Sequence, residues 1–291
     1  MSENNQSTLS RRRLLATAGG ALTVTAGGVG TAGVAGVAGA SGDDGGDPEP
    51  TQRWGRRCPE ATIRPSHEHC EGSTMAGCAD DHPETVRLQA AVRAVLESRY
   101  PTVGDIVDDG FLPYFDTLDR STDGWSHWLS PEYIGDDGVL DPDRPESILV
   151  DNETWRAMGV MFIATRDGEP IEPPSVYGED EPDEERCSPW HYHVGLPGRK
   201  AWWYYENVYE DEGWPSLRLP CRTPCMMHVW TVDHPDGIYA HGGPPAEYRD
   251  RTAAAESGLE TNAVPGEDTL DWEALPDDIV PSVLPDDLEW P

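Results

Sequence analysis

The chain has 291 residues and a formal net charge of −33, from 21 lysines and arginines against 54 aspartates and glutamates. So few cations do not build a basic face that neutralises several phosphates, which argues against a nucleic-acid-binding protein. The same negative charge repels nucleotide phosphates, and we therefore expect neither a nucleic acid nor a nucleotide as partner.

The first forty residues predict export. Arg11-Arg12-Arg13 precede residues 14–40, which contain no charged side chain and end in small residues. This is the order of an export signal, and paired arginines followed by leucines resemble the twin-arginine signal. We therefore expect residues 1–40 to be a signal peptide and the protein to be secreted or held in the cell envelope. Because the uncharged stretch could also span a bilayer core of ~30 Å, an uncleaved membrane anchor is the alternative.

Three regions follow the signal. Residues 41–53 are rich in Gly, Asp and Pro without apolar periodicity, which predicts a disordered linker. Residues 54–251 hold all six cysteines and most of the tryptophans, enough for a single domain with a sizeable core. Residues 252–291 are acidic and rich in proline, which favours a solvated tail. In the alternative, its apolar residues such as Trp272 and Leu275 pack on the domain.

The domain itself shows one helical pattern followed by short apolar runs. Pro83 suits a first helical position, the apolar residues of 83–99 recur at helical spacing, and Tyr100-Pro101 then ends the helix. Apolar runs bounded by turn residues predict strands at 147–150, 157–165, 190–194, 201–205 and 226–232. We therefore expect an α+β domain, with one N-terminal helix packed on a mainly antiparallel β-sheet and long acidic loops.

Six cysteines in the exported part predict disulfide bonds, because the number is even and the compartment is oxidising. Six cysteines permit fifteen pairings, and the sequence does not choose among them. Cys58, Cys70 and Cys78 precede the helix in a stretch with little else to order it, so we expect at least one bridge there. Cys221 and Cys225 are close enough to form a loop staple or half of a zinc site.

Four histidines lie among apolar or aromatic residues, where an imidazole needs a hydrogen-bond partner or a metal. His191 and His193 alternate with apolar residues. On a strand their rings share one face about 7 Å apart along the chain, and their Nε2 atoms can converge on one metal ion. We predict these two as ligands and His228 and His127 as third and fourth candidates. The alternative is that each is an ordinary core histidine.

Glu146 is a further candidate, because it directly precedes the apolar run 148–150. A buried carboxylate needs a partner, which is either Arg144, a metal or a metal-bound water, and we expect Glu146 near the open position of the metal site. Of the other histidines, we expect His67, His69 and His82 to be exposed. His234 and His241 flank a turn and are expected to be loop residues, which leaves them able to close the site.

Two resemblances accompany these patterns. The acidic composition, with Lys200 as the single lysine, resembles that of proteins from extremely halophilic archaea. Over about residues 85 to 241 the chain resembles a family of exported bacterial and archaeal proteins of unknown function, through motifs that include Arg99-Tyr100-Pro101-Thr102-Val103, Ser126-His127-Trp128-Leu129-Ser130-Pro131, Asp141-Pro142-Asp143-Arg144-Pro145-Glu146 and His228-Val229-Trp230. This resemblance implies a secreted protein and no particular activity.

His191-x-His193 followed by Pro235-x-Gly237-x-x-x-His241 also resembles the two metal motifs of cupins. A cupin glutamate three or four residues after His193 is lacking, and His241 lies one place too far from Gly237. The resemblance therefore implies an analogy in metal geometry and not a shared fold.

The leading hypothesis is an exported domain that binds one transition metal, and neutral imidazoles suit Zn, Cu, Fe or Ni. The alternative is a non-catalytic secreted or cell-envelope protein whose aromatic residues contact a glycan or a protein partner. The run Trp202-Trp203-Tyr204-Tyr205 is the candidate for such a surface. Exposure of two of these four side chains would favour the alternative.

Overall fold

A computed structural model describes residues 58–114, 118, 124–209, 219–249, 252–281 and 283–284. All of these residues belong to one compact unit. The predicted signal peptide and linker, residues 1–40 and 41–53, lie outside them. In the part of the chain that is described, no helix is both long enough and apolar enough to cross a membrane.

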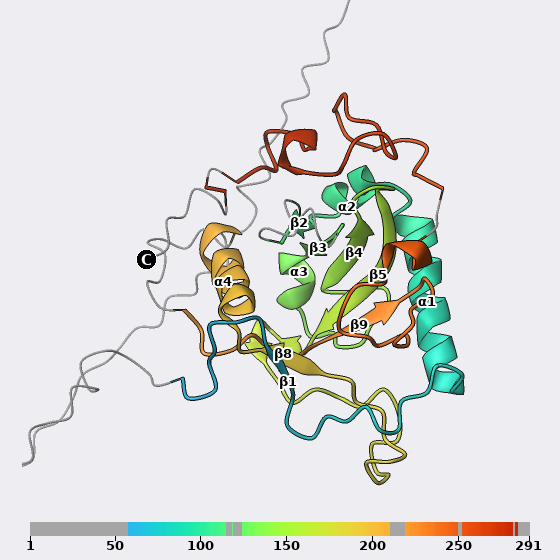
Figure 1. Cartoon of the computed structure of the whole chain (residues 1–291), viewed down its shortest axis with the longest axis vertical. Coiled ribbons are helices and arrows are strands. Elements are labelled where there is room, and N and C mark those ends of the chain that lie inside the picture. Colours follow the sequence, from blue (N-terminus) through green and yellow to red (C-terminus); the bar gives the residue numbers. More distant parts are fainter. Residues whose placement is uncertain are drawn as a thin grey trace, which may run out of the picture. The chain divides into compact units, whose positions relative to one another are not determined.

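A seven-stranded sheet forms the centre of the unit, and every pairing between its strands is antiparallel (Figure 1). Its strand order is β1-β8-β9-β5-β4-β3-β2. The prediction of a mainly antiparallel sheet is confirmed. The bounds of its strands are β1 (His67–His69), β2 (Leu112–Pro113), β3 (Trp125–Leu129), β4 (Ser147–Asp151), β5 (Arg156–Ile163), β8 (His191–His193) and β9 (Met226–Trp230), and a separate hairpin consists of β6 (Thr165–Arg166) and β7 (Glu169–Pro170).

Helix α1 (Pro83–Arg99) has the bounds that the sequence predicts. His82 caps it, since its Nδ1 accepts a hydrogen bond from the backbone N–H of Glu84. The helix contacts strands β5 and β9 and covers one face of the sheet. The remaining helices are α2 (Val103–Asp108), α3 (Pro131–Ile134) and α4 (Leu196–Tyr204), with a π-helical turn (Tyr205–Tyr209) and 3₁₀ turns at Ala246–Tyr248 and Trp272–Ala274.

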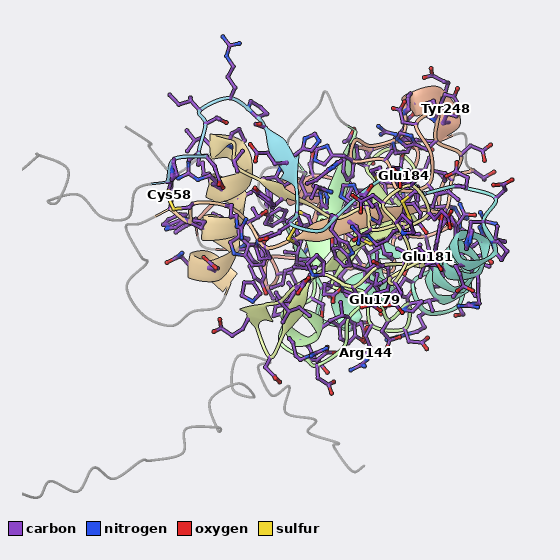
Figure 2. The ribbon with its side chains drawn as sticks, turned by 90° about the horizontal axis from the view of Figure 1, so that it is seen from below. Cys58, Arg144, Glu179, Glu181, Glu184 and Tyr248 are labelled. Atoms are coloured by element: carbon purple, nitrogen blue, oxygen red, sulfur yellow. A yellow bond between two sulfur atoms is a disulfide. The ribbon has the colours of Figure 1, made fainter. Side chains whose placement is uncertain are left out.

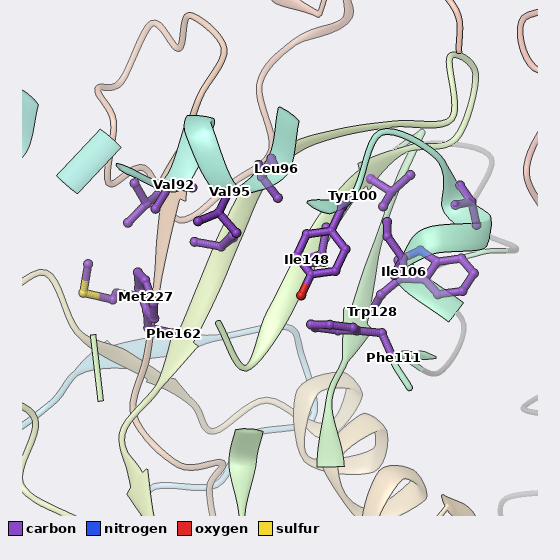
Figure 3. Close-up of a cluster of buried hydrophobic side chains, with 14 of the residues drawn as sticks. Val92, Val95, Leu96, Tyr100, Ile106, Phe111, Trp128, Ile148, Phe162 and Met227 are labelled. Carbon is purple, nitrogen blue, oxygen red and sulfur yellow. The ribbon is translucent and has the colours of Figure 1, made fainter. Parts of the chain in front are cut away.

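The larger core cluster lies between α1 and the sheet. Figure 3 shows Val92 and Val95 of the helix above Phe162 and Met227 of the strands, and all four side chains are buried. Since side chains alternate along a strand, neighbouring residues face the opposite side. A second cluster on that side includes Trp230 of β9 together with Trp202 of α4 and Tyr205 of the turn that follows it.

Residues 201–205, predicted as a strand, belong to α4 and the turn that follows it. The aromatic run has high β-propensity, but Pro197 in the first turn and the extended Gly195 before it begin a helix here. All four aromatic side chains are buried, with exposed fractions of 8 % or less. These four side chains therefore form no exposed aromatic surface. The exposure of two of them, which would have favoured a glycan-binding or protein-binding function, is not found.

The acidic C-terminal region packs on the core over part of its length. Leu270 is fully buried, and Trp272 and Leu275 are 7 % and 6 % exposed. The indole N–H of Trp155 donates to the carbonyl of Asp268 at 2.9 Å. The solvated-tail prediction is therefore wrong for these residues, because their apolar side chains gain from burial while nearby carboxylates such as Glu273 and Asp277 stay exposed.

The loop between β7 and β8 is long and acidic, as expected. Its glutamates Glu179, Glu181 and Glu184 are exposed (Figure 2). Such a loop keeps its charges in water and leaves the core to the neighbouring strands.

Three disulfides connect the segment before α1 to later parts of the chain, and they confirm the predicted disulfide bonds. The pairs are Cys58–Cys221, Cys70–Cys225 and Cys78–Cys187. The loop staple and the zinc half-site considered for Cys221 and Cys225 are wrong, since each of these residues pairs elsewhere. Three disulfides fit an oxidising, extracellular location.

Candidate metal centre

Six of the nine histidines gather on the side of the sheet that α4 covers. The structure brings together the four predicted histidines and adds two others. His67 was expected only to be exposed, and His241 was expected in a loop able to close the site. The six are His67 of β1, His127 of β3, His191 and His193 of β8, His228 of β9, and His241 in the loop after β9.

Strand register explains why the rings from three strands share one face. His67 is directly opposite His193 in the β1–β8 ladder, and His191 is opposite Met226 in the β8–β9 ladder. Opposed residues of an antiparallel pair point to the same face. His228 lies two residues after Met226 and therefore shares this face as well.

Backbone hydrogen bonds hold β8 in place. The N–H of His193 donates to the hydroxyl of Thr223 at 3.0 Å, and the N–H of Thr223 donates back to the carbonyl of His193 at 3.1 Å. Thr223 is buried. The disulfide Cys70–Cys225 begins directly after β1 and ends directly before β9, so it clamps both sides of β8.

The loop that carries His241 is folded back on β9. The backbone N–H of Trp230 donates to the carbonyl of Ile238 at 3.0 Å, and its indole N–H donates to the carbonyl of Ala240 at 2.8 Å. Trp230 is fully buried. The position of His241 is therefore determined by a residue of the same strand that supplies His228.

The other three histidines have separate structural roles or face water. Nδ1 of His234 accepts a hydrogen bond from Asp236 N, which leaves its Nε2–H to donate to the carbonyl of Gly242 at 3.1 Å. His82 caps α1 and stacks on Tyr177. His69 is exposed. His69 lies opposite His191 in the β1–β8 ladder and so belongs to the same strand face. In the described part of the chain, none of these three rings contacts the six clustered rings.

His191, His193 and His241 form the part of the cluster with the geometry of a metal site. One ligand nitrogen of each lies within 4.8 Å of the others. Two imidazole nitrogens on one tetrahedral ion lie ~3.3 Å apart, so small side-chain rotations bring the three nitrogens onto one ion. Nε2 of His191 is buried and has no hydrogen-bond partner among the described residues, which is unusual for a buried polar atom.

His67 covers the solvent side of these three rings. It stacks on His241 with ring centroids 3.8 Å apart and planes 16° apart, and it is itself exposed. His191 is only 3 % exposed. The cluster therefore extends from the surface into the interior.

His127 and His228 lie at the end of the cluster that does not contact His67, and we call them the inner pair. His127 is half-buried. The Nε2 atoms of the pair are 3.3 Å apart, and His228 is 3 % exposed. Strands β3 and β9 are separated by β4 and β5, so in a flat sheet these side chains would stand ~14 Å apart. The sheet must curl toward α4 for the two rings to meet, and a register shift between Leu149 and Val150 of β4 contributes to the bend.

Burial keeps the imidazoles neutral. Burial, together with a smaller effect of charge repulsion by neighbouring histidines, lowers the pKa of His193 to about 4 and that of His241 to about 3. The pKa values of His191 and His228 lie well below the usual range for the same reasons. At neutral pH the ring nitrogens therefore offer lone pairs to a metal without competition from protons.

Glu146 does not lie with the histidines, contrary to the prediction. The carboxylate accepts a hydrogen bond from the backbone N–H of Ile163 at 3.2 Å, and Arg144 pairs with Asp136 and Asp141 instead. Burial raises the pKa of Glu146 to about 8. Its partner is thus a backbone amide.

The alternation of side chains explains this separation. Leu149 pairs with His127, and Ser147 is in line with His228 through Met161, so both face the histidine side of the sheet. Glu146 directly precedes Ser147 and therefore faces the opposite side. The position of Glu146 next to an apolar run in the sequence therefore does not place it at the site.

Comparison of the chain with protein-family models, curated proteins and solved structures finds no match. The interpretation of the site accordingly depends on its own geometry.

A glycine of α4 is a sensitive position of the site. A Cβ atom added at Gly198 would lie 2.5 Å from Cβ of His193, so the substitution Gly198→Ala must displace the histidine or the helix. We expect a loss of about 1–3 kcal/mol in the free energy of unfolding, measured with urea, and weaker metal binding by calorimetry. Gly242→Ala is the control, since no atom lies within 4 Å of its added Cβ. Equal stability and metal affinity of the two variants would contradict the expected clash.

Proposed function

We propose that this protein is an exported metal-binding domain that holds a transition metal ion through His191, His193 and His241. The convergence of their ligand nitrogens within 4.8 Å carries the proposal. A set of three neutral imidazoles suits Zn, Cu, Fe or Ni. Three protein ligands leave a position for water or a small molecule, as in metal sites that bind exchangeable ligands.

The burial gradient supports access to that position. His241 is partly exposed, and the stacked ring of His67 is exposed, whereas His191 is buried. A ligand from solvent would therefore approach past His67. The imidazole of His67 is close enough to donate a hydrogen bond to a molecule bound there, or to replace it as a fourth ligand.

The proposal also includes the place of action. Residues 1–40 have the pattern of a twin-arginine signal, and three disulfides suit an oxidising compartment. The net charge of −33 suits a salt-rich environment, where counterions screen the repulsion between carboxylates. We therefore propose that the domain binds its metal outside the cytoplasm, in concentrated salt.

Metal content of the untagged protein tests the function. After removal of metal with a chelator and reloading with Zn(II), Cu(II), Ni(II) or Fe(II) in turn, we expect at least one tightly bound equivalent of one of these ions. The double variant His191→Ala and His193→Ala should lose one equivalent, measured by elemental analysis after gel filtration. Replacing a residue that only hydrogen-bonds to a metal ligand typically lowers metal affinity 10–100-fold. Replacing a ligand itself should lower the affinity more.

His69→Ala is the matched control, because His69 is exposed and its ring contacts none of the six clustered rings in the described part of the chain, although it lies opposite His191 in the β1–β8 ladder. It should bind the same number of ions as the wild type. Unchanged metal content in the His191 and His193 double variant would refute the proposed function.

A further inference from the structure

The pair His127 and His228 is a second group of potential ligands, distinct from the three nitrogens of the proposed site. His127 comes from β3 and His228 from β9, strands that are not neighbours in the sheet. Their Nε2 atoms are 3.3 Å apart. This is the spacing of two imidazole nitrogens that bind one ion at 2.0–2.1 Å with a tetrahedral angle, about 3.3 Å.

Aromatic side chains enclose this pair. The ring of Trp125 lies 4.5 Å from that of His127 and 5.9 Å from that of His228, and Trp230 packs edge-on against Trp125 at 5.2 Å. A Cβ at Gly243 would lie 2.3 Å from the indole nitrogen of Trp125, so the loop after His241 packs tightly on this enclosure. Such packing holds both imidazoles in one geometry.

His191 lies between the two groups. Its ring centroid is 5.5 Å from that of His193 and 5.6 Å from that of His228. His191 is 3 % exposed, and its buried Nε2 has no hydrogen-bond partner among the described residues. A buried nitrogen without a partner in this place points to a ligand that the two groups share or that bridges them.

From this geometry we infer that the protein binds a second transition metal ion between His127 and His228, next to the ion held by His191, His193 and His241. The inference rests on the proposed function, since it assigns the two ions to one dinuclear centre. The inner ion has two imidazole ligands from the protein. Its remaining positions take water or a small bridging ligand that also reaches the outer ion. Zn(II) and Cu(II) accept such mixed coordination.

A hydrogen bond between His127 and His228 would hold their rings at the same distance as a shared ion. The number of bound ions distinguishes a hydrogen-bonded pair from a metal site. The variant pair is His127→Gln together with His228→Gln. Glutamine keeps a donor and an acceptor near the positions of the ring nitrogens but is a poor ligand for these ions, so a purely structural contact would survive. Unchanged near-ultraviolet circular dichroism of the metal-free variant would show that the fold is retained.

The experiment loads the full-length, metal-free protein with Cu(II) and counts bound ions by elemental analysis and electron paramagnetic resonance. We expect two ions in the wild type, one in the His127 and His228 variant, and one in the variant His191→Ala with His193→Ala. The two ions of the wild type should couple magnetically and give a spin count well below two. In either variant the spin count should equal the number of ions.

Other results decide against one proposal or the other. A single ion that the His127 and His228 variant retains would overturn the second site and leave the proposed function intact. A single ion lost in both variants would also overturn it, because one ion would then use both groups. An ion lost only in the His127 and His228 variant would overturn the proposed function instead, and so would a wild type without bound metal.

Discussion

Acidification from pH 6.5 to pH 4 is expected to remove about 5 kcal/mol of the stability that His193 and His241 together contribute to the metal-free protein. In the unfolded chain the histidines take up protons near pH 6.5. In the folded protein burial lowers the pKa of His193 to about 4 and that of His241 to about 3, so these rings stay neutral. The unfolded state thus binds more protons across this interval. The contribution of these two rings to stability is therefore full above pH 6.5 and is lost as the pH decreases toward 4. The contribution of Glu146, whose pKa is raised to about 8, has the opposite sign and is the same in the variants compared below.

Urea titrations of chelator-treated protein at fixed high salt measure this effect. The variant His193→Gln with His241→Gln should show a clearly smaller loss over the same interval, because glutamine does not titrate. His69→Gln should behave like the wild type, since His69 is exposed. The comparison between variants cancels the contribution of the many surface carboxylates, which all three proteins share. An identical pH dependence in the wild type and the double variant would contradict the expected protonation of these two rings.

Removal of the Cys70–Cys225 disulfide should have the second large effect. The bond closes a loop with a sequence separation of 155, for which chain entropy gives a stabilisation of about 5 kcal/mol. Strand β8 pairs with β9 only at His191 and Met226. Few ladder hydrogen bonds would therefore hold the two strands together once the disulfide is removed. We expect the variant Cys70→Ser with Cys225→Ser to lose about 2–5 kcal/mol in unfolding by urea and to bind metal more weakly.

Cys58–Cys221 provides the matched comparison. Its sequence separation is 163, so its loss changes the entropy of the unfolded chain by nearly the same amount. It does not adjoin a strand that carries a histidine of the cluster. The variant Cys58→Ser with Cys221→Ser should therefore be destabilised similarly but keep more of its metal affinity. Equal metal affinities of the two variants in calorimetry would show that the Cys70–Cys225 bond does not hold the site together.

The part of the site that could be predicted from sequence is the part that follows from strand periodicity. Alternation with apolar residues placed His191 and His193 on one face, and the same pattern identified His228 and His127. His67 was assigned to an exposed segment, although His67-Glu68-His69 has the same His-x-His spacing as the strand that it pairs with. Two equal motifs of this kind could have indicated the pairing of β1 with β8.

Other parts of the structure depend on contacts that no local pattern contains. His241 reaches the cluster because Trp230 hydrogen-bonds to Ile238 and Ala240, which is a property of the folded loop. Helix α4 was mistaken for a strand because aromatic residues favour strands, while packing against the sheet decides the outcome. Disulfide pairing likewise follows from the approach of segments more than 100 residues apart.

The curl of the sheet gives the inner strands an influence on metal chemistry that they do not exercise through ligands. β4 and β5 supply none of the six imidazoles, yet they separate β3 from β9, and the register shift between Leu149 and Val150 lies on β4. Straightening that bend would draw His127 away from His228 while every donor atom stayed the same. In the proposed centre, selectivity for ions of different radius would therefore be adjustable from the backbone of two strands that supply no ligand.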